Sequence, residues 1–494
     1  MKPYQILAFF FSVILVLMVI SFVFPPEGIK ITDELSLKFI SIEDVFQEDS
    51  IEYADISEII EQSSVEIEHT TDTLITPQVP LPDSITVTDT LRADESGLKE
   101  SIHPIQFPAG KRQLFNPFFS TIDQLKEKQN LVRILHYGDS QIEADRITGY
   151  IRHRMQLNFG GSGCGLIPAV PLYNGKRSIR QSYSENWERF TGFVNRDTSI
   201  HHKRYGALFG FSAIRRPANI FTGNEWLGFE PSPLAYYTAR DFNRVSLILG
   251  KTDNSFAKID FIVNDSTMNK IEVDFSFRYN KLNWELEATP KSISFTFSPD
   301  ESLIVYGVSL DNTWGVAVDN VPLRGSAGLM FSKTDTSFLR QMYQDMNVGM
   351  LILQFGGNVV PYLKNFKQYE NYFRRELQVV KKMLPDVPVL VVGPSDMSIK
   401  DKGKYVTHPN LEGIRDAVMN AALDSGCAFW DMYEAMGGRN SMPSWVFAEP
   451  SLAVSDFVHF NTRGARIIGE MLYNSIMNEY GIWKQNTNRN TDIE

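Results

Sequence analysis

Cysteines and cofactor or metal motifs are what this sequence lacks. Its 494 residues include two cysteines, Cys164 and Cys427, which form no C-x-x-C pair and have no metal-ligand spacing. Two reduced or buried thiols and a single disulfide are both compatible with that count. No H-E-x-x-H, no P-loop and no G-x-G-x-x-G after a predicted strand is present, so nothing in the sequence indicates a zinc, nucleotide or dinucleotide site. We expect no cofactor and no metal.

Basic charge and histidine are also scarce. The formal net charge is −11, which leaves no general electrostatic footprint for nucleic acid, and we expect no nucleic-acid partner. Only eight histidines are present, which shortens the search for a catalytic base. His201 and His202 are adjacent and are the one pair that suggests a metal. On a strand, however, neighbouring side chains face opposite ways, which argues against it.

Long apolar runs are absent except for one at the N-terminus. Residues 6–24 hold 19 residues without a charge, enough to cross a bilayer as a helix. Lys2 precedes the run and acids follow it, so the charge bias places the N-terminus inside and the bulk of the chain outside the cytoplasm. A cleaved signal peptide is the alternative, but no A-x-A-like site precedes Pro25 and Pro26. We predict an uncleaved transmembrane anchor.

A tether is predicted for residues 25–110. Asp33 to Glu68 is crowded with acids and has Lys38 as its only basic residue, and a Thr-, Pro- and Asp-rich stretch follows. Such a composition buries too little apolar surface to offset the entropy of ordering, so mostly extended, mobile chain is expected. A solvated spacer is favoured over a site for a basic partner. Some apolar periodicity in residues 51–67 is compatible with a short helix.

Apolar strands and amphipathic helices alternate in two separate parts of the remaining chain, which predicts one α/β domain with a parallel sheet. The first part has helices over 118–128 and 141–159 around a buried strand over 131–137, and the second runs from 316 to 480. Between them, short runs of alternating apolar and polar residues are separated by turn residues, which indicates an inserted antiparallel β-sandwich or jelly roll. The predicted strands of this insertion include 245–249, 259–263, 271–277, 293–297 and 303–308.

Ser140 is the candidate nucleophile. It stands in Gly138-Asp139-Ser140, directly after the buried strand, and catalytic groups of α/β folds collect at such carboxyl ends. A serine hydroxyl needs a base, most often histidine. His459 is the candidate base, because Asp456 precedes it by three residues on one loop and can hold the far ring nitrogen. Taken alone, D-x-x-H is weak and ordinary loop residues are the better interpretation.

Two further turns could supply hydrogen-bond donors to an oxyanion. Asn358 ends a Gly-Gly-Asn turn after one predicted strand, and Gly325 lies in a Gly-containing turn after another. Gly328, in the same turn as Gly325, is the alternative. Each turn is ordinary on its own. The evidence is their order along the chain: the Ser140 turn, the Gly325 turn, the Asn358 turn and the D-x-x-H loop form four successive blocks.

These four blocks, in this order, resemble the SGNH/GDSL hydrolase superfamily. More narrowly, the chain resembles a bacterial subgroup that includes peptidoglycan O-acetylesterases. The segments that carry this resemblance are GDSQIEAD (138–145), GPSDMS (393–398), AFWDMYEAMGG (428–438), SMPSW (441–445) and the D-x-x-H ending. That subgroup carries a β-sandwich, related to carbohydrate-binding modules, inserted at the same place. The resemblance implies a flavodoxin-like three-layer fold without a cofactor. It also implies Ser140 as nucleophile, His459 as base, Asp456 as orienting acid, and Ser140, Gly325 and Asn358 around the oxyanion.

Two positions depart from the pattern. Gln141 stands where related esterases often have His or Leu, and Phe457 stands where Gly is common between the Asp and the His. Neither change removes a catalytic group. The aromatic residues of the insertion could stack on sugar rings, although core residues are the simpler interpretation: Trp187, Trp226, Tyr236, Tyr237 and Trp284.

The resulting prediction is a bacterial inner-membrane protein whose catalytic domain lies on the periplasmic side. Its parts are a transmembrane anchor (1–24), a tether (25–110), the SGNH domain (111–183 and 313–484), the inserted β-sandwich (184–312) and a polar tail (485–494). The predicted activity is removal of O-acetyl groups from an envelope polysaccharide, peptidoglycan first. An O-acetyltransferase supplied by a membrane-bound O-acyltransferase would use the same triad, and a non-catalytic glycan-binding protein is the third interpretation.

Overall fold

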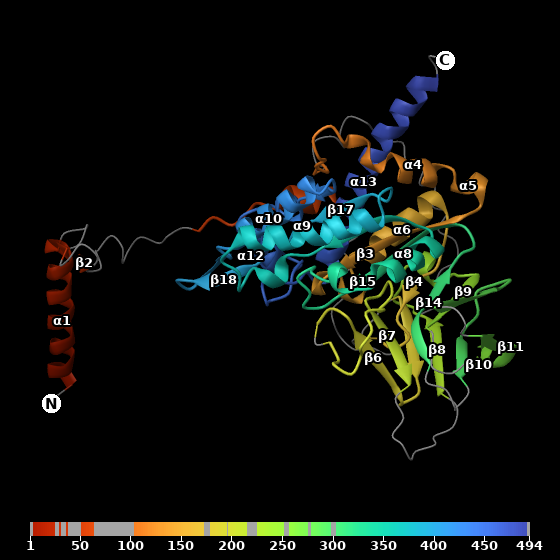
Figure 1. Ribbon diagram of the computed structural model, residues 1–494. Helices are drawn as coiled ribbons and strands as arrows, with labels where there is room; N and C mark the ends of the chain where they lie inside the picture. Colours follow the sequence, from red (N-terminus) through yellow and green to blue (C-terminus); the bar gives the residue numbers. More distant parts are fainter. Residues whose placement is uncertain are drawn as a thin grey trace, which may run out of the picture. The chain divides into compact units, whose positions relative to one another are not determined.

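The chain contains an N-terminal helix and a large α/β unit with additional antiparallel sheets (Figure 1). The computed structural model describes residues 3–24, 29–30, 36–37, 51–63, 103–171, 178–194, 196–214, 225–250, 256–274, 278–297 and 303–491. Contacts divide it into Met1–Glu52 and Tyr53–Glu494, which are treated separately. Most of the predicted tether lies outside the described residues.

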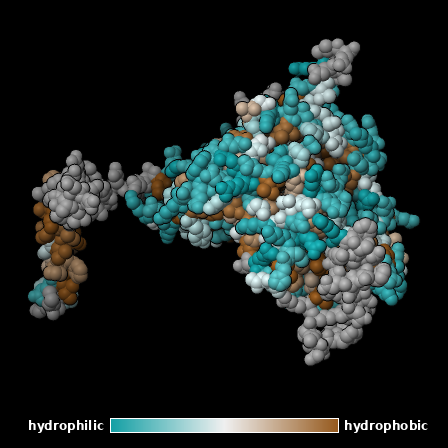
Figure 2. Space-filling view, in the orientation of Figure 1, coloured by the Kyte–Doolittle hydropathy of each residue, from teal (hydrophilic) through white to brown (hydrophobic). Residues whose placement is uncertain are grey.

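The first unit holds helix α1 (Pro3–Val23), which is apolar and exposed along its length (Figure 2). It is the one helix among the described residues that is long and apolar enough to cross a membrane. A signal sequence has the same properties. The helix is therefore suited to either role.

Five parallel strands form the sheet of the second unit, in the order β15-β3-β16-β17-β20. Their bounds are β3 Leu131–Gly138, β15 Gly315–Pro322, β16 Val348–Gln354, β17 Val389–Val392 and β20 Ala428–Trp430. Numbered along the chain, the spatial order is 2-1-3-4-5, the doubly wound order of flavodoxin-like folds. The predicted fold class is confirmed, and β3 and β15 are neighbours although the whole insertion separates them in sequence.

Helices cover both faces of this sheet because its strands are apolar on both sides. Along β3, Ile134 packs into one core while Leu135 packs into the other. One face is covered by α4 (Asn116–Asp123), α6 (Thr148–Phe159) and α13 (Thr462–Thr491), and the other by α8 (Thr336–Asp345), α9 (Phe366–Met383) and α10 (Leu411–Asp424). This is the pattern of a buried parallel sheet.

The predicted helix over 141–159 is wrong in its first part. Residues Ser140–Asp145 form the short 3-10 segment η2, and Ala144 and Asp145 have positive φ values of 56° and 64°. An α-helix cannot pass through two left-handed residues, so α6 begins only at Thr148. The helix predicted over 118–128 is likewise interrupted, at Gln124, between α4 and α5 (Leu125–Lys128). At the other end, α13 continues through part of the predicted polar tail.

Two antiparallel sheets form the segment between α6 and β15. One has the order β11-β10-β13-β8-β5, and the other β12-β9-β14-β7-β6 with β4 added beside β14. The bounds are β4 Gly165–Ile167, β5 Ile179–Tyr183, β6 Trp187–Thr191, β7 Gly210–Ile214, β8 Glu225–Pro231, β9 Arg244–Gly250, β10 Phe256–Val263, β11 Ser266–Asp274, β12 Tyr279–Glu285, β13 Ile293–Phe297 and β14 Ile304–Asp311. Side chains from both sheets, such as Phe261 and Leu247, share one buried core. Strands β4 and β5 precede position 184, so the antiparallel sheets start earlier in the chain than predicted.

A buried cluster of charges joins the antiparallel sheets to the parallel sheet. Arg133 on β3 pairs with Asp319 on β15 at 2.6 Å and with Asp311 on β14 at 2.6 Å. All three side chains are at most 3 % exposed. Burial alone would lower the pKa of Arg133, but the two carboxylates raise it well above its usual value. Arg133 therefore stays charged, and its two ion pairs fix the register between the two parts.

Two stretches of the predicted tether pack on the α/β unit instead of extending into solvent. Helix α3 (Ser57–Gln62) is preceded by Ile56, which is 7 % exposed and belongs to a core of the unit. Ala54 exchanges hydrogen bonds with residues of the 440–444 segment. Further along, Gln106 pairs with Phe429 of β20 as an antiparallel bridge. The acidic composition did not predict these contacts, because a few apolar residues in each stretch are enough to pack that stretch on the α/β unit.

Candidate active site

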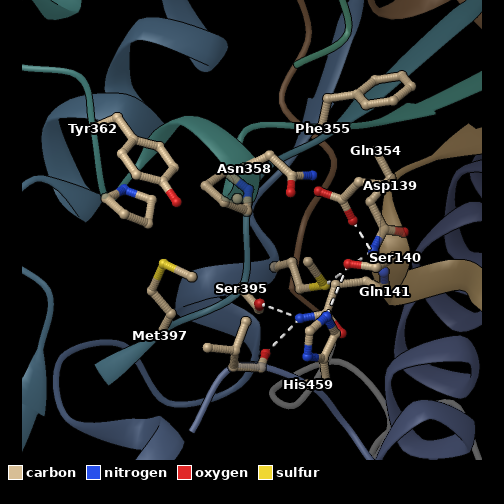
Figure 3. A pocket seen from close by; sticks show the side chains of 15 residues that line it. Asp139, Ser140, Gln141, Gln354, Phe355, Asn358, Tyr362, Ser395, Met397 and His459 are labelled. Carbon is tan, nitrogen blue, oxygen red and sulfur yellow. Dashed lines mark hydrogen bonds between the residues drawn. The ribbon is translucent and has the colours of Figure 1, made fainter. Parts of the chain in front are cut away.

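The turn after β3 positions Ser140 at the carboxyl end of a central strand. At Gly138, the first residue of the GDS block, a Cβ would lie 3.0 Å from the Ile142 side chain, so a larger residue would crowd the buried Ile142. Asp139 accepts a hydrogen bond from the Gln141 N–H at 3.0 Å, which closes the turn. Burial raises the pKa of Asp139 to about 6, against the opposing effect of that N–H. The turn points the Ser140 hydroxyl toward the loop before α13 (Figure 3).

That loop supplies His459 and Asp456. Ser140 Oγ lies 2.8 Å from His459 Nε2, and His459 Nδ1 lies 2.7 Å from Asp456 Oδ2. Asp456 Oδ1 also accepts the N–H groups of Val458 and His459, at 2.9 and 3.0 Å. Burial opposes ionisation of Asp456, but these hydrogen bonds outweigh it and lower its pKa. A carboxylate, an imidazole and a hydroxyl are thus in hydrogen-bond contact in the order that a catalytic triad needs. They are the three residues singled out from the sequence, and their catalytic role stays a prediction.

Asn358 lies beside this relay and Gly325 does not line the pocket. The Asn358 amide donates one hydrogen bond to the Ser326 carbonyl at 3.2 Å, and an amide has a second N–H to offer. Gly325 is exposed, with a φ of 76° that favours glycine. Its role as an oxyanion donor, and the choice between it and Gly328, stay predictions. Gly357, directly before Asn358, does line the pocket and was not singled out from the sequence.

A small pocket opens in front of Ser140, with a volume of about 140 Å³. Much of its wall is apolar (Figure 3). The lining residues are Asp139, Ser140, Gln141, Gln354, Phe355, Gly357, Asn358, Pro361, Tyr362, Pro394, Ser395, Met397, Met432, Val458 and His459. Pockets for drug-sized ligands measure about 300–1,000 Å³, so this one suits a small acyl group and not a long chain. Most of these residues carry no chemistry that a sequence would reveal, although the GPSDMS block contributes three of them.

Phe457 and Gln141, the two departures from the family pattern, both support the loop of His459. Phe457 keeps a left-handed backbone with φ of 58°, is 5 % exposed, and stacks on Tyr405 with ring centroids 3.5 Å apart. Tyr405 belongs to the β18–β19 hairpin (Ser398–Asp401 and Lys404–Thr407), which the sequence did not predict. Gln141 donates to Ser395 Oγ at 3.0 Å and to the Val458 carbonyl at 2.6 Å.

The described residues hold no cluster of three or more His, Cys, Asp or Glu side chains able to bind a metal ion. His201 is exposed, and His202 Nδ1 accepts the Arg204 N–H at 3.2 Å. Cys164 and Cys427 are both buried free thiols. Among the aromatic residues of the insertion, Trp187 and Trp284 are core residues, whereas Trp226 is 38 % exposed.

His136, on β3, lies near the site but is fully buried and contacts β16 and α6. Its ring nitrogens are 3.1 Å from Gln354 Oε1 and 2.9 Å from Thr148 Oγ1. Burial lowers its pKa to about 4, against the opposing effect of Gln354. The imidazole is therefore neutral in the folded protein and holds together β3, β16 and α6.

We expect the free energy of unfolding to fall as the pH is lowered from about 6.5 toward 4. In the unfolded chain His136 takes up a proton near its ordinary pKa of 6.5, whereas the folded protein resists protonation down to about 4. Its contribution is thus complete above pH 6.5 and is lost as the pH falls through that window. Urea denaturation at several pH values should show a shallower slope for His136→Gln than for the wild type. Identical slopes would contradict this assignment.

The fold, a five-stranded parallel sheet in the order 2-1-3-4-5 with Ser140 directly after β3, is the SGNH-type fold that the sequence resemblance implied. A solved structure of a peptidoglycan O-acetylesterase has a similar fold, with a TM-score of 0.59 and 18% identity over 74% of this chain and 96% of that chain. No protein-family profile and no curated protein sequence matches the chain. At this identity the likeness shows the fold, and the activity needs a separate argument.

Two further solved structures are more distant. The salicylyl-acyltransferase SsfX3 of a tetracycline biosynthetic pathway gives a TM-score of 0.27 and 13% identity over 61% of this chain and 98% of that chain. A family two carbohydrate esterase from Cellvibrio japonicus gives 0.25 and 8% over 62% of this chain and 99% of that chain. At these TM-scores neither adds to the argument.

Proposed function

We propose that this protein is a serine esterase that removes O-acetyl groups from an envelope polysaccharide, peptidoglycan first. The observation that carries the proposal is the relay of two short hydrogen bonds, Ser140 Oγ to His459 Nε2 and His459 Nδ1 to Asp456, at the mouth of a pocket of about 140 Å³. The size of the pocket favours an acetyl ester over a lipid. The likeness to a peptidoglycan O-acetylesterase supports the choice of polymer.

The reaction follows from the geometry. His459 Nε2 takes the Ser140 proton as Oγ attacks the acetyl carbonyl carbon, and Asp456 stabilises the imidazolium that forms. The oxyanion accepts hydrogen bonds from the Ser140 N–H and the Asn358 amide. Gly325, predicted as a third donor, does not line the pocket and is assigned no step. The C–O bond to the sugar then breaks and the sugar oxygen takes the proton from His459. Water, deprotonated by His459, attacks the acyl carbon; the bond from that carbon to Ser140 Oγ breaks, Oγ takes the proton from His459, and acetate leaves.

Acetate release from O-acetylated peptidoglycan, compared between wild type and Ser140→Ala, tests the proposal. We expect release only with an intact Ser140, at a rate that added deacetylated glycan does not change. Transfer of the acetyl group to that glycan in place of release would identify an acetyltransferase instead. No release and no transfer would leave glycan binding alone as the function of the fold.

The Asn358→Ala variant should lower kcat by about 10²–10³ with little change in KM, because one oxyanion donor is worth that much in the transition state. The measurement is steady-state hydrolysis of a chromogenic acetate ester. Asn371→Ala, on the exposed side of α9, is a matched control that should keep full activity. An Asn358 variant that loses affinity but keeps kcat would show that the amide binds substrate and does not stabilise the oxyanion.

The insertion is proposed to hold the polymer. Trp226 on β8 is 38 % exposed, and its ring edge lies 3.3 Å from the Cβ position of Gly228, so the ring covers a strand residue that has no side chain. A shallow groove of about 360 Å³ lies on the same sheet, between the polar side chains of β10 and β11 and Thr296, the strand partner of Trp226. An aromatic ring beside hydrogen-bonding groups is suited to a sugar.

Replacing Trp226 with alanine should raise KM for O-acetylated peptidoglycan about 5-fold, since covering part of one ring is worth ~1 kcal/mol. Hydrolysis of the small chromogenic ester should not change. Met268→Ala, an exposed residue of β11, serves as the control. An equal effect on polymer and small ester would contradict a role in polymer binding.

Helix α1 is proposed to anchor the protein in the bacterial inner membrane with the catalytic unit on the periplasmic side, and a membrane-bound O-acyltransferase is the proposed source of the acetyl groups.

A further inference from the structure

Gln141, next to the nucleophile, contacts both residues that flank His459. Its Nε2 donates to the Val458 carbonyl at 2.6 Å, and its Oε1 accepts the Phe460 N–H at 3.4 Å. The same Nε2 also donates to Ser395 Oγ at 3.0 Å. The side chain is 7 % exposed, so these bonds do not compete with bulk water. The nucleophile turn is thus tied to the peptide groups on either side of the base.

Arg146 makes a second connection between the same two segments. Its Nη1 donates to the Phe460 carbonyl at 2.8 Å, and its Nη2 donates to the Ser140 carbonyl at 2.8 Å. Phe460 is therefore held at its N–H by Gln141 and at its carbonyl by Arg146. The guanidinium can make both bonds at once because its N–H groups are fixed in a plane.

The loop of His459 needs such support. Phe457 holds a left-handed φ of 58°, which costs free energy for a residue with a side chain. The Asp456 and His459 side chains are 44% and 31% exposed, so packing around them is incomplete. Misplacing a reacting group by about 1 Å can cost 10²-fold in rate. Phe457 packs on Tyr405 and holds one side of the loop, and Gln141 and Arg146 hold the side that faces the nucleophile.

We propose that Gln141 and Arg146 are positioning residues that hold the His459 loop in register with Ser140. This inference rests on the proposed esterase function and extends it to groups that do not touch the reacting atoms. It explains why glutamine can stand after the nucleophile: its amide supplies both the donor and the acceptor that the loop backbone requires.

The test uses the full-length protein with Gln141→Met, which keeps the length of the side chain and removes its hydrogen bonds. We expect kcat for a chromogenic acetate ester, and the rate at which a fluorophosphonate labels Ser140, to fall about 10- to 100-fold while KM stays within about 2-fold. Gln156→Met is the matched control: Gln156 is equally buried and donates to the Gly163 carbonyl, but lies on α6 away from the relay. It should keep kcat even if its thermal stability falls as much.

Arg146→Lys is the second variant, since lysine keeps the charge but cannot bond both carbonyls in a plane. We expect its kcat to fall as well, and the double variant to lose less than the product of the two single losses, because both residues hold Phe460. Full kcat in both single variants, or a kcat loss in Gln156→Met equal to that in Gln141→Met, would overturn the inference. A wild type that releases no acetate would instead overturn the esterase function itself, and an active Ser140→Ala would overturn Ser140 as its nucleophile, so these failures are distinguishable from failure of the positioning role.

Discussion

Ser140→Ala is expected to lower kcat for an acetyl ester by about 10⁶-fold, the scale typical of removing the nucleophile from a serine triad. Without the hydroxyl no acyl-enzyme can form, and His459 has no group to deprotonate except water. The oxyanion donors remain, so a small residual rate above the uncatalysed reaction should persist. Folding should be unchanged, because the hydrogen bond that Ser140 Oγ loses is to the partly exposed ring of His459.

Mass spectrometry after treatment with a fluorophosphonate provides the independent measurement. Wild type should gain one covalent adduct, on the peptide that contains Ser140, and Ser140→Ala should gain none. Ser398→Ala is the control: this half-buried serine adjoins the pocket residue Met397, and labelling and activity should both survive its loss. Labelling of a different residue in the wild type would contradict the assignment of the nucleophile.

The Arg133→Met variant should lose about 3–5 kcal/mol of unfolding free energy, because it leaves two buried carboxylates without their counter-ion. Asp319 would keep only the Leu166 N–H, at 2.9 Å, and Asp311 the hydroxyl of Ser309, at 2.5 Å. Methionine fills most of the volume of the arginine stem, so the loss is due to charge and not to a cavity. The junction between the parallel and antiparallel sheets should be the first region to open.

Urea denaturation followed by circular dichroism measures this loss. The control is Lys270→Met, which removes an exposed ion pair with Asp260 and should cost less than about 1 kcal/mol. Equal losses in the two variants would mean that the buried cluster contributes no more than a surface pair.

The sequence predicted the sheet well because its evidence was local. Apolar runs of four to eight residues, such as that of β3, are constrained by burial on both faces, and the order of strands and helices then determines the topology. Ser140 could be singled out for a related reason, because it directly follows a buried strand at the carboxyl edge of the sheet. His459 and Asp456 were singled out by their three-residue spacing on one loop, and the structure brings them into hydrogen-bond contact with Ser140.

What the sequence could not predict depends on distant contacts. The break between η2 and α6 follows from left-handed Ala144 and Asp145, and the Asp145 carboxylate is held by Arg152 and Ser178. The local sequence does not predict that Arg152 and Ser178 contact Asp145. The contacts of Gln141 with the His459 loop join residues more than 300 positions apart, so the sequence identified the residue as unusual but not what it does.

The bridge between Gln106 and Phe429 has a consequence for solubility. Strand β20 is an edge of the parallel sheet, and an uncovered edge invites pairing with another molecule. Gln106 occupies the N–H and the carbonyl of Phe429 with two bonds of 2.8 Å, which blocks the middle of this short strand. A fragment that began at residue 111 would expose that edge and the apolar surface under Ile56 together, and should self-associate, whereas one that retained these docked stretches should remain monomeric.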